Sequence, residues 1–135
     1  MGLNVLFIED DTIEVMKLHR AIAKLGLKHN IIEAENGEHA IDILQNKQVR
    51  PDIILLDLNM PKMNGIEFLK VLKESKSLKY IPIVILTTSG NQLDLQECYS
   101  IGIAGYVIKP LKYEDYVEKL KTILEYWNSN ELIKS

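Results

Sequence analysis

Five short apolar runs recur along the chain at intervals of about 25 residues, and they constrain the fold more than any other feature. They occupy residues 5–8, 31–32, 53–56, 83–86 and 106–108. Because polar and apolar residues do not alternate within them, the runs predict strands that are buried on both faces. Each run is followed by a stripe of apolar residues at helical spacing, most clearly between Tyr113 and Trp127. The pattern therefore predicts five consecutive β-α units.

Strict alternation of strands and helices implies right-handed crossovers and a parallel sheet with helices on both faces. We therefore predict a doubly wound α/β fold, a flavodoxin-like three-layer sandwich of (βα)5 topology with a parallel five-stranded sheet. The 135 residues are expected to form one domain. Its core is expected over residues 4–127, with a short C-terminal tail over residues 128–135.

Composition and charge exclude several classes of protein. Sixteen basic residues against nineteen acidic ones give a formal net charge of −3, and no run of Lys and Arg forms a stripe for a nucleic acid backbone. The longest apolar run, residues 80–86, contains Pro82 and is far shorter than the roughly 20 residues that span a bilayer. A single cysteine cannot form an intramolecular disulfide, which favours a reducing compartment. We expect a cytoplasmic protein that binds neither nucleic acid nor membrane directly.

Polar side chains follow four of the five predicted strands. They are Glu9, Asp10 and Asp11 after the first strand, Asp57 after the third, Thr87, Thr88 and Ser89 at the end of the fourth, and Lys109 after the fifth. In an open parallel sheet, ligands bind outside the carboxyl ends of the strands. If the predicted fold is right, these side chains converge on one edge of the sheet.

The chemistry of this group points to a metal ion and a phosphoryl group. Clustered carboxylates repel one another unless a cation relieves the repulsion. Oxygen ligands without His or Cys favour Mg²⁺, which takes one or two carboxylates and keeps waters and a phosphate. Lys109 supplies a positive charge for a phosphate oxygen, and Thr87 supplies a hydroxyl donor. Asp57, at the end of the central strand, is placed to attack phosphorus and form an aspartyl phosphate.

Taken in order, these residues resemble the receiver domain of the response-regulator family of two-component signalling, of the stand-alone kind. The resemblance runs from Asn4 to about Trp127. It rests on VLFIED at 5–10, DLNMP at 57–61 with NG at 64–65, LTTS at 86–89, and GY at 105–106 with KP at 109–110. Each segment is weak alone, but together they are specific. The chain is similar to chemotaxis regulators (CheY-like proteins) and to phytochrome-associated regulators.

The resemblance implies the strand order 2-1-3-4-5 and a role for each site residue. Asp57 would accept a phosphoryl group from a sensor histidine kinase or a histidine phosphotransfer protein. Mg²⁺ would be held by Glu9, Asp10, Asp57 and the backbone oxygen of Asn59. Lys109 would contact the phosphoryl group, with Thr87 and Thr88 beside it. The Lys109–Pro110 bond is commonly cis in the family, which would aim the lysine inward, but the sequence does not decide the isomer.

The resemblance also implies a route for the signal. Phosphorylation adds only about one negative charge to Asp57, so the message must be a change of shape. Thr87 would move toward the phosphoryl group and vacate space for Tyr106, which changes the face formed by the fourth helix, fifth strand and fifth helix. That face would bind a downstream effector protein or a second copy in a homodimer. Alternatively, Tyr106 only packs against the strand edge, and Trp127 either anchors an interface or caps the core.

Two residues depart from the commoner family pattern. Glu9 stands where Asp is more usual, which lengthens one arm of the acidic pair, and metal binding is still expected. Thr88 stands where Ala or Gly is frequent. We hypothesise that Thr88, together with Ser89, tunes the lifetime of the phosphoryl group.

Other functions fit the residues less well. An aspartate-nucleophile phosphatase needs an acid two positions after Asp57, where this chain has Asn59. A flavin-binding electron carrier needs a phosphate-cradling loop where this chain has three acids. The alternatives left open are a phosphorylation-independent interaction module and an intermediate phosphoryl carrier. We expect no enzyme activity beyond self-phosphorylation and self-dephosphorylation, and we expect Cys98 to be a small core residue.

Overall fold

The computed structural model describes residues 2–47 and 49–133. Within them, five parallel strands form one sheet in the order β2-β1-β3-β4-β5. The strands are β1 (Asn4–Ile8), β2 (Asn30–Ala34), β3 (Ile53–Leu56), β4 (Ile83–Thr87) and β5 (Gly105–Ile108). The helices are α1 (Thr12–Leu25), α2 (Gly37–Ile41) with a π-helical turn η1 (Asp42–Asn46), α3 (Gly65–Glu74), α4 (Gln92–Ile101) and α5 (Tyr113–Asn128). The predicted fold class and strand order are both confirmed.

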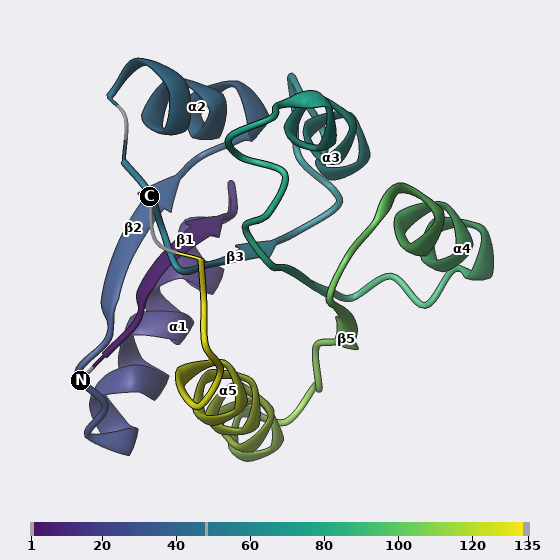
Figure 1. Cartoon of the computed structure of the whole chain (residues 1–135). Coiled ribbons are helices and arrows are strands. Elements are labelled where there is room, and N and C mark those ends of the chain that lie inside the picture. Colours follow the sequence, from purple (N-terminus) through teal and green to yellow (C-terminus); the bar gives the residue numbers. More distant parts are fainter. Residues whose placement is uncertain (1, 48, 134–135) are drawn as a thin grey trace.

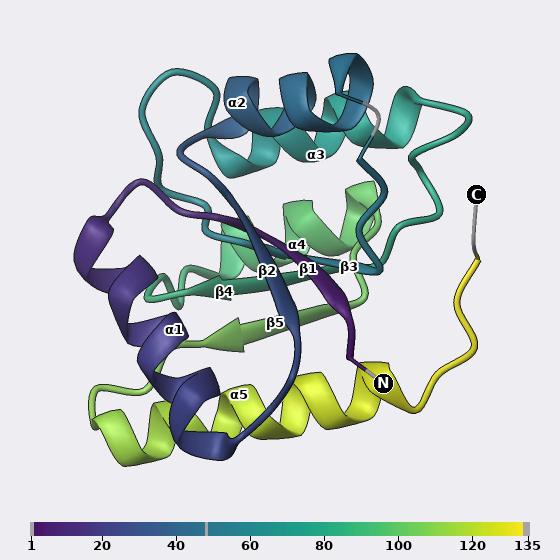
Figure 2. The same cartoon turned by 90° about the vertical axis from the view of Figure 1, so that its left-hand side faces the viewer.

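Helices cover both faces of the sheet, with α1 and α5 on one face and α2, α3 and α4 on the other (Figure 1, Figure 2). Side chains alternate between the two layers along each strand. In β1, Val5 and Phe7 enter the core beneath α1 and α5, whereas Leu6 and Ile8 enter the core beneath the other helices. All four are buried. This burial on both faces explains the unbroken apolar runs of the sequence.

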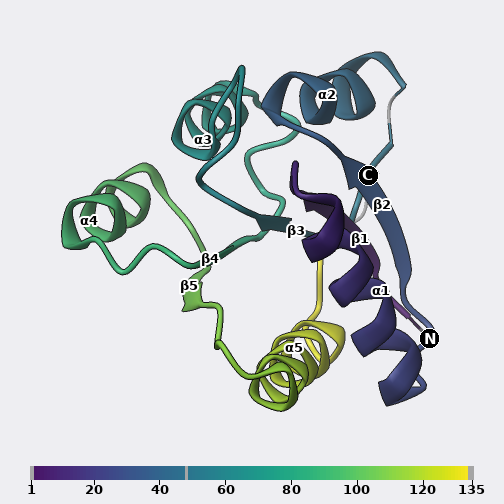
Figure 3. The ribbon, with the colours of Figure 1, turned by 180° about the vertical axis from the view of Figure 1, so that it is seen from behind.

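The two edge strands are less buried than the sequence pattern predicts. Every residue of β1 after Asn4, and all of β3 and β4, is buried, but β2 and β5 are only partly buried and Ile108 of β5 is 45% exposed. An edge strand has a neighbour on one side only, so part of its surface stays in contact with water. Strand β5 lies between α4 and α5 (Figure 3). The three elements thus share one partly apolar face.

Gly65, the first residue of α3, allows the helix to start directly against the end of β3. A Cβ atom at this position would lie 2.7 Å from the backbone oxygen of Asp57 and 2.8 Å from Cα of Leu58. Asn64 caps the helix by accepting a hydrogen bond from the backbone N–H of Glu67, whose side chain accepts one from the backbone N–H of Asn64. The Asn-Gly pair therefore fixes the loop that follows Asp57.

Cys98 and Trp127 take up different positions in the core. Cys98 is fully buried on the inner side of α4, as expected for a small core residue, and burial raises the pKa of its thiol to about 11. Trp127 is half-buried and packs against the core beneath α1 and α5, with its ring edge-on to Tyr126 at 5.1 Å. The structure thus supports a capping role for Trp127.

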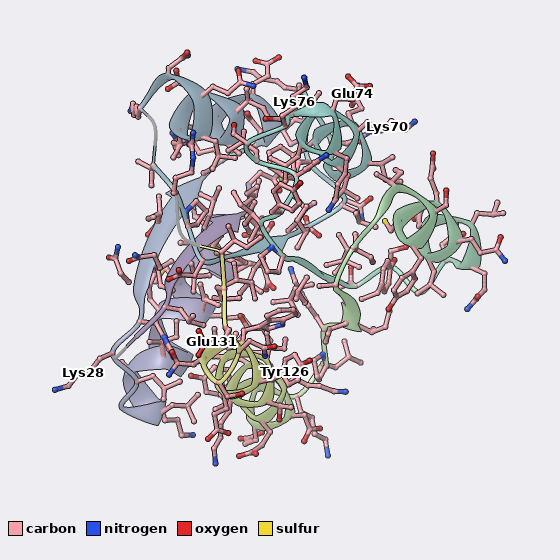
Figure 4. The ribbon with its side chains drawn as sticks, in the orientation of Figure 1. Lys28, Lys70, Glu74, Lys76, Tyr126 and Glu131 are labelled. Carbon is pink, nitrogen blue, oxygen red and sulfur yellow. The ribbon has the colours of Figure 1, made fainter. Side chains whose placement is uncertain are left out.

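Charged side chains project from separate parts of the surface. Lys28 points outward after α1, on the far side of the molecule from Lys70 and Lys76 (Figure 4). These three lysines therefore do not form one basic stripe. None of the helices within residues 2–47 and 49–133 has the length and apolar character that crossing a membrane requires.

Candidate functional site

Backbone hydrogen bonds hold three of the predicted site residues in line with the strands that precede them. The N–H of Glu9 donates to the oxygen of Ala34, and the N–H of Asp57 donates to the oxygen of Ile8, at 3.0 and 3.1 Å. The N–H of Lys109 donates to the oxygen of Thr87 at 2.8 Å. The parallel ladder thus extends one residue beyond β1, β3 and β5. Their side chains start from fixed positions at the carboxyl edge of the sheet.

Three carboxylates meet at this edge. Glu9, Asp10 and Asp57 each offer an oxygen, and these oxygens all lie within 4.8 Å of one another. Glu9 is 4% exposed and Asp57 is 7% exposed, whereas Asp10 is open to solvent. The donors are all hard oxygen atoms and one side of the group is accessible. The arrangement therefore fits a divalent cation such as Mg²⁺ or Mn²⁺.

Burial raises the pKa of two of these carboxyl groups. For Asp57, the charge of Lys109, the Thr87 hydroxyl and the backbone N–H of Asn59 oppose the effect of burial without cancelling it. The pKa of Glu9 rises to about 7, because burial outweighs its hydrogen bond and ion pair with Lys109. Buried carboxylates with raised pKa values are common at functional sites, and a bound cation would favour their ionised forms.

Lys109 is buried and has two carboxylate partners. Its Nζ donates to Oε1 of Glu9 at 2.8 Å and lies 3.1 Å from Oε1 of Glu14. Burial lowers the pKa of Lys109, but the hydrogen bonds and charges of Glu9, Asp57 and Glu14 outweigh burial and raise it. The lysine is therefore a positively charged ammonium group. The Lys109–Pro110 peptide bond is trans.

Glu14 is the site residue that the sequence analysis missed. It lies in the first turn of α1 rather than at the end of a strand. The other site residues were identified by their position directly after a strand or within a family motif, and Glu14 lies in neither. The sequence shows only that Glu14 follows an acidic strand end and lies one helical turn before Lys17. This pattern is too common to predict a site residue.

The residues at the end of β4 differ in burial and in contacts. Thr87 is fully buried, and its hydroxyl accepts a hydrogen bond from the backbone N–H of Ser89 at 3.3 Å. Thr88 is exposed. Tyr106 is partly buried, and its hydroxyl donates to the backbone oxygen of Ser89 at 2.9 Å. The structure therefore brings Thr87 to Asp57 and links Tyr106 to the loop after Thr87, while Thr88 lies at the solvent side.

A cavity of about 710 Å³ opens beside the carboxylates. Its lining includes Glu9, Asp10, Met16, Glu35 and Lys62. Across this region, His19 Nε2 and Glu33 Oε2 lie 2.6 Å apart. The cavity opens the Glu9 and Asp10 side of the site to solvent.

The fold and the site define a doubly wound α/β protein with a carboxylate cluster, a threonine and a lysine at the carboxyl edge of its sheet. The family model of the response regulator receiver domain matches residues 5–121. The chain therefore belongs to the response regulator receiver domain family of two-component signalling. Receiver domains are signalling proteins rather than classical enzymes, and they bind a divalent metal at their acidic pocket.

Individual relatives agree in sequence and in structure. The probable methanogenesis regulatory protein FilR2 of Methanothrix harundinacea is 38% identical over 127 residues, covering 91% of this chain and 82% of FilR2. The phosphorylated cyanobacterial phytochrome response regulator RcpA superposes with a TM-score of 0.92 at 30% identity, covering 99% of this chain and 100% of RcpA. The Mn²⁺-bound form of Rcp1, a response regulator of Synechocystis, superposes with a TM-score of 0.89 at 30% identity, covering 98% and 99%. The predicted resemblance to stand-alone regulators is confirmed.

Proposed function

We propose that Asp57 accepts a phosphoryl group from a sensor histidine kinase or a histidine phosphotransfer protein, and that the protein acts as a phosphorylation-dependent switch. A carboxylate oxygen of Asp57 forms the new P–O bond while the P–N bond of the phosphohistidine breaks, and the histidine ring, already protonated on its other nitrogen, leaves as neutral imidazole. The cluster of Glu9, Asp10 and Asp57 oxygens within 4.8 Å of one another carries the proposal. Burial keeps Asp57 weakly solvated and limits its access to water.

The proposed metal is Mg²⁺, held by Glu9, Asp10, Asp57 and the backbone oxygen of Asn59. When bound, such an ion neutralises charge on the carboxylates and on the phosphoryl oxygens. The raised pKa values of Glu9 and Asp57 support this assignment, because burial disfavours their ionised forms and Lys109 offsets this only in part, so that a bound cation would stabilise those forms. The greater length of Glu9 suits a water-mediated contact.

Three further side chains are proposed to act on the phosphoryl group. Lys109 supplies the ammonium group and Thr87 the hydroxyl that bind phosphoryl oxygens. Thr88, at the solvent side, limits the access of water and so lengthens the lifetime of the phosphoryl group. Chemistry catalysed by the chain itself is limited to its own phosphorylation and dephosphorylation.

Movement of Thr87 is proposed to reach the face of α4, β5 and α5 through Tyr106. When Thr87 turns toward the phosphoryl group, its hydrogen bond from Ser89 is lost, which frees the loop that holds the Tyr106 hydroxyl. Exposed apolar side chains on and beside this face support a docking role; they are Tyr99, Ile108 and Leu111. A downstream effector protein or a second copy of the chain is the proposed occupant.

The proposal includes a receiver core over residues 4–127 and a cytoplasmic location, which the single buried cysteine supports. Two alternatives differ in what they predict. A phosphorylation-independent interaction module would not respond to a phosphoryl group. An intermediate phosphoryl carrier would accept the group and pass it to a histidine without needing the change at Tyr106.

Nuclear magnetic resonance with beryllofluoride, a mimic of the phosphoryl group, tests the switch. We expect the mimic and Mg²⁺ together to shift the signals of Thr87, Tyr106 and the face of α4, β5 and α5 in the parent protein. The Asp57→Asn variant should show no such shifts. Unchanged Tyr106 signals in a parent protein that binds the mimic would overturn the switch and leave the carrier function.

A further inference from the structure

Glu14 holds a position in the site that is fixed independently of Lys109. It lies in the first turn of α1, where the helix dipole favours a negative charge. Its Oε2 lies 3.3 Å from Lys17 Nζ, and its side chain is 20% exposed. Lys17 Nζ in turn lies over the ring of the buried Tyr116, 4.7 Å from the ring centre. The Glu14 carboxylate therefore has a partner other than Lys109, and that partner is itself held against the core.

Lys109 is bound on the α1 side of the sheet edge rather than by Asp57. Its ammonium group contacts Glu9 and Glu14, whereas Asp57 influences it through charge. An ammonium group has three donor hydrogens, and these two carboxylates engage two of them. The Glu9 side chain is only 2% exposed, compared with 20% for Glu14. Because partly exposed ion pairs are weaker, the contact with Glu14 is the one that yields more readily.

We propose that Glu14 is a positioning residue that draws the Lys109 ammonium toward α1 in the unphosphorylated protein, so that Lys109 must loosen its contact with Glu14 to bind a phosphoryl group on Asp57 fully. The inference rests on the proposed function, because it presupposes a phosphoryl group on Asp57. Glu14 then competes with the phosphoryl oxygens for the same ammonium group. It thereby lowers the affinity of the site for its phosphorylated state.

Calorimetric titration with beryllofluoride in Mg²⁺ tests this competition in the parent, Glu14→Gln and Glu35→Gln proteins. Glu35 lines the cavity beside Glu9 and Asp10, so its substitution removes the same charge from the neighbourhood and leaves both partners of Lys109 in place. We expect Glu14→Gln to bind the mimic roughly fivefold more tightly, which is about 1 kcal/mol at tenfold per 1.4 kcal/mol. The Glu35→Gln protein should stay within about twofold of the parent.

The Lys109 ammonium signal provides a second measurement that a merely structural role of Glu14 would not move. In the parent we expect a signal that exchanges slowly with water and shifts when the mimic binds. In Glu14→Gln the signal should exchange faster before any mimic is added. Equal affinities in the parent and Glu14→Gln, an equal gain in Glu35→Gln, or an unaltered ammonium signal would overturn the inference. A parent protein that binds no mimic at all would overturn the proposed function, and this inference with it.

Discussion

The hydroxyl of Tyr106 donates a 2.9 Å hydrogen bond to the backbone oxygen of Ser89 and so joins β5 to the loop that follows β4. Ser89 donates its backbone N–H to the Thr87 hydroxyl at 3.3 Å and its own hydroxyl to Asp94 at 3.1 Å. Asp94 lies in the first turn of α4. A movement of Thr87 therefore acts on a loop that already connects β5 with α4.

Removing the Tyr106 hydroxyl tests this connection. We expect Tyr106→Phe to lower the free energy of unfolding by about 0.5–1.5 kcal/mol, the usual cost of one hydrogen bond. Binding of beryllofluoride at Asp57 should persist, because Tyr106 contacts the loop and not the carboxylates. Denaturant unfolding and calorimetry measure the two quantities. Loss of mimic binding in this variant would show that Tyr106 belongs to the binding site itself.

Gly65 offers a test of the backbone around Asp57. An added Cβ would lie 2.7 Å from the Asp57 backbone oxygen, so the end of β3 must shift to accommodate Gly65→Ala. We expect a loss of roughly 2 kcal/mol in the free energy of unfolding and a weaker affinity for Mg²⁺. Gly90→Ala is the matched control, because no atom beyond Gly90 and its two chain neighbours lies within 4 Å of its added Cβ. Equal effects of the two substitutions would contradict the close approach at Gly65.

The raised pKa values of Glu9 and Asp57 predict that two quantities change in opposite directions with pH. These are the stability of the metal-free protein and the additional stabilisation by Mg²⁺. In the metal-free protein, the folded state binds protons more readily than the unfolded chain. Its stability should therefore fall as the pH rises from 4.5, the ordinary pKa of Glu9, toward about 7. A divalent cation binds the ionised carboxylates, so the stabilisation by Mg²⁺ should grow over the same range.

Thermal unfolding at several pH values, with and without Mg²⁺, measures this difference. Glu9→Gln is the informative comparison, because it removes the group with the pKa near 7. In that variant we expect a smaller stabilisation by Mg²⁺ with a weaker dependence on pH. A stabilisation by Mg²⁺ that is the same at every pH in the parent would contradict the assignment of Glu9 to the metal site.

Cys98 should be chemically inert in the folded protein. The thiol is fully buried and its pKa is raised to about 11, so almost no reactive thiolate is present near neutral pH. We expect a thiol-alkylating reagent to label Cys98 only as the protein unfolds in denaturant. Mass spectrometry follows the labelling. Rapid modification of the native protein would show that α4 opens readily above the core.

The fold was predictable because the three central strands are buried on both faces and their apolar runs are regularly spaced. The edge strand β5 departs from this pattern, since its apolar residue Ile108 remains 45% exposed. An apolar residue in a strand therefore does not always indicate the core. The π-helical turn η1 was not predictable from periodicity. It inserts one residue into the helical turn, and the N–H of Lys47 donates to the oxygen of Asp42.

The clustering of Glu9, Asp10, Asp57, Thr87 and Lys109 was predictable because a parallel sheet gathers strand ends at one edge. The contact between the Lys109 ammonium group and Glu14 was not predictable. It depends on how two long side chains from α1 and β5 meet in space, and neither spacing nor composition encodes that geometry. The trans isomer of the Lys109–Pro110 bond was likewise not predictable from the sequence.

Covalent phosphorylation of Asp57 is the most direct test of the central claim. The native chain and Asp57→Asn are incubated with a small-molecule phosphodonor, with Mg²⁺ or with a chelator, and their intact masses are compared. We predict that only the native chain with Mg²⁺ gains one phosphoryl group, and that peptide mapping locates it on Asp57. A native chain that gains no phosphoryl group from such a donor or from a candidate kinase, or an equal gain in Asp57→Asn, would contradict the account.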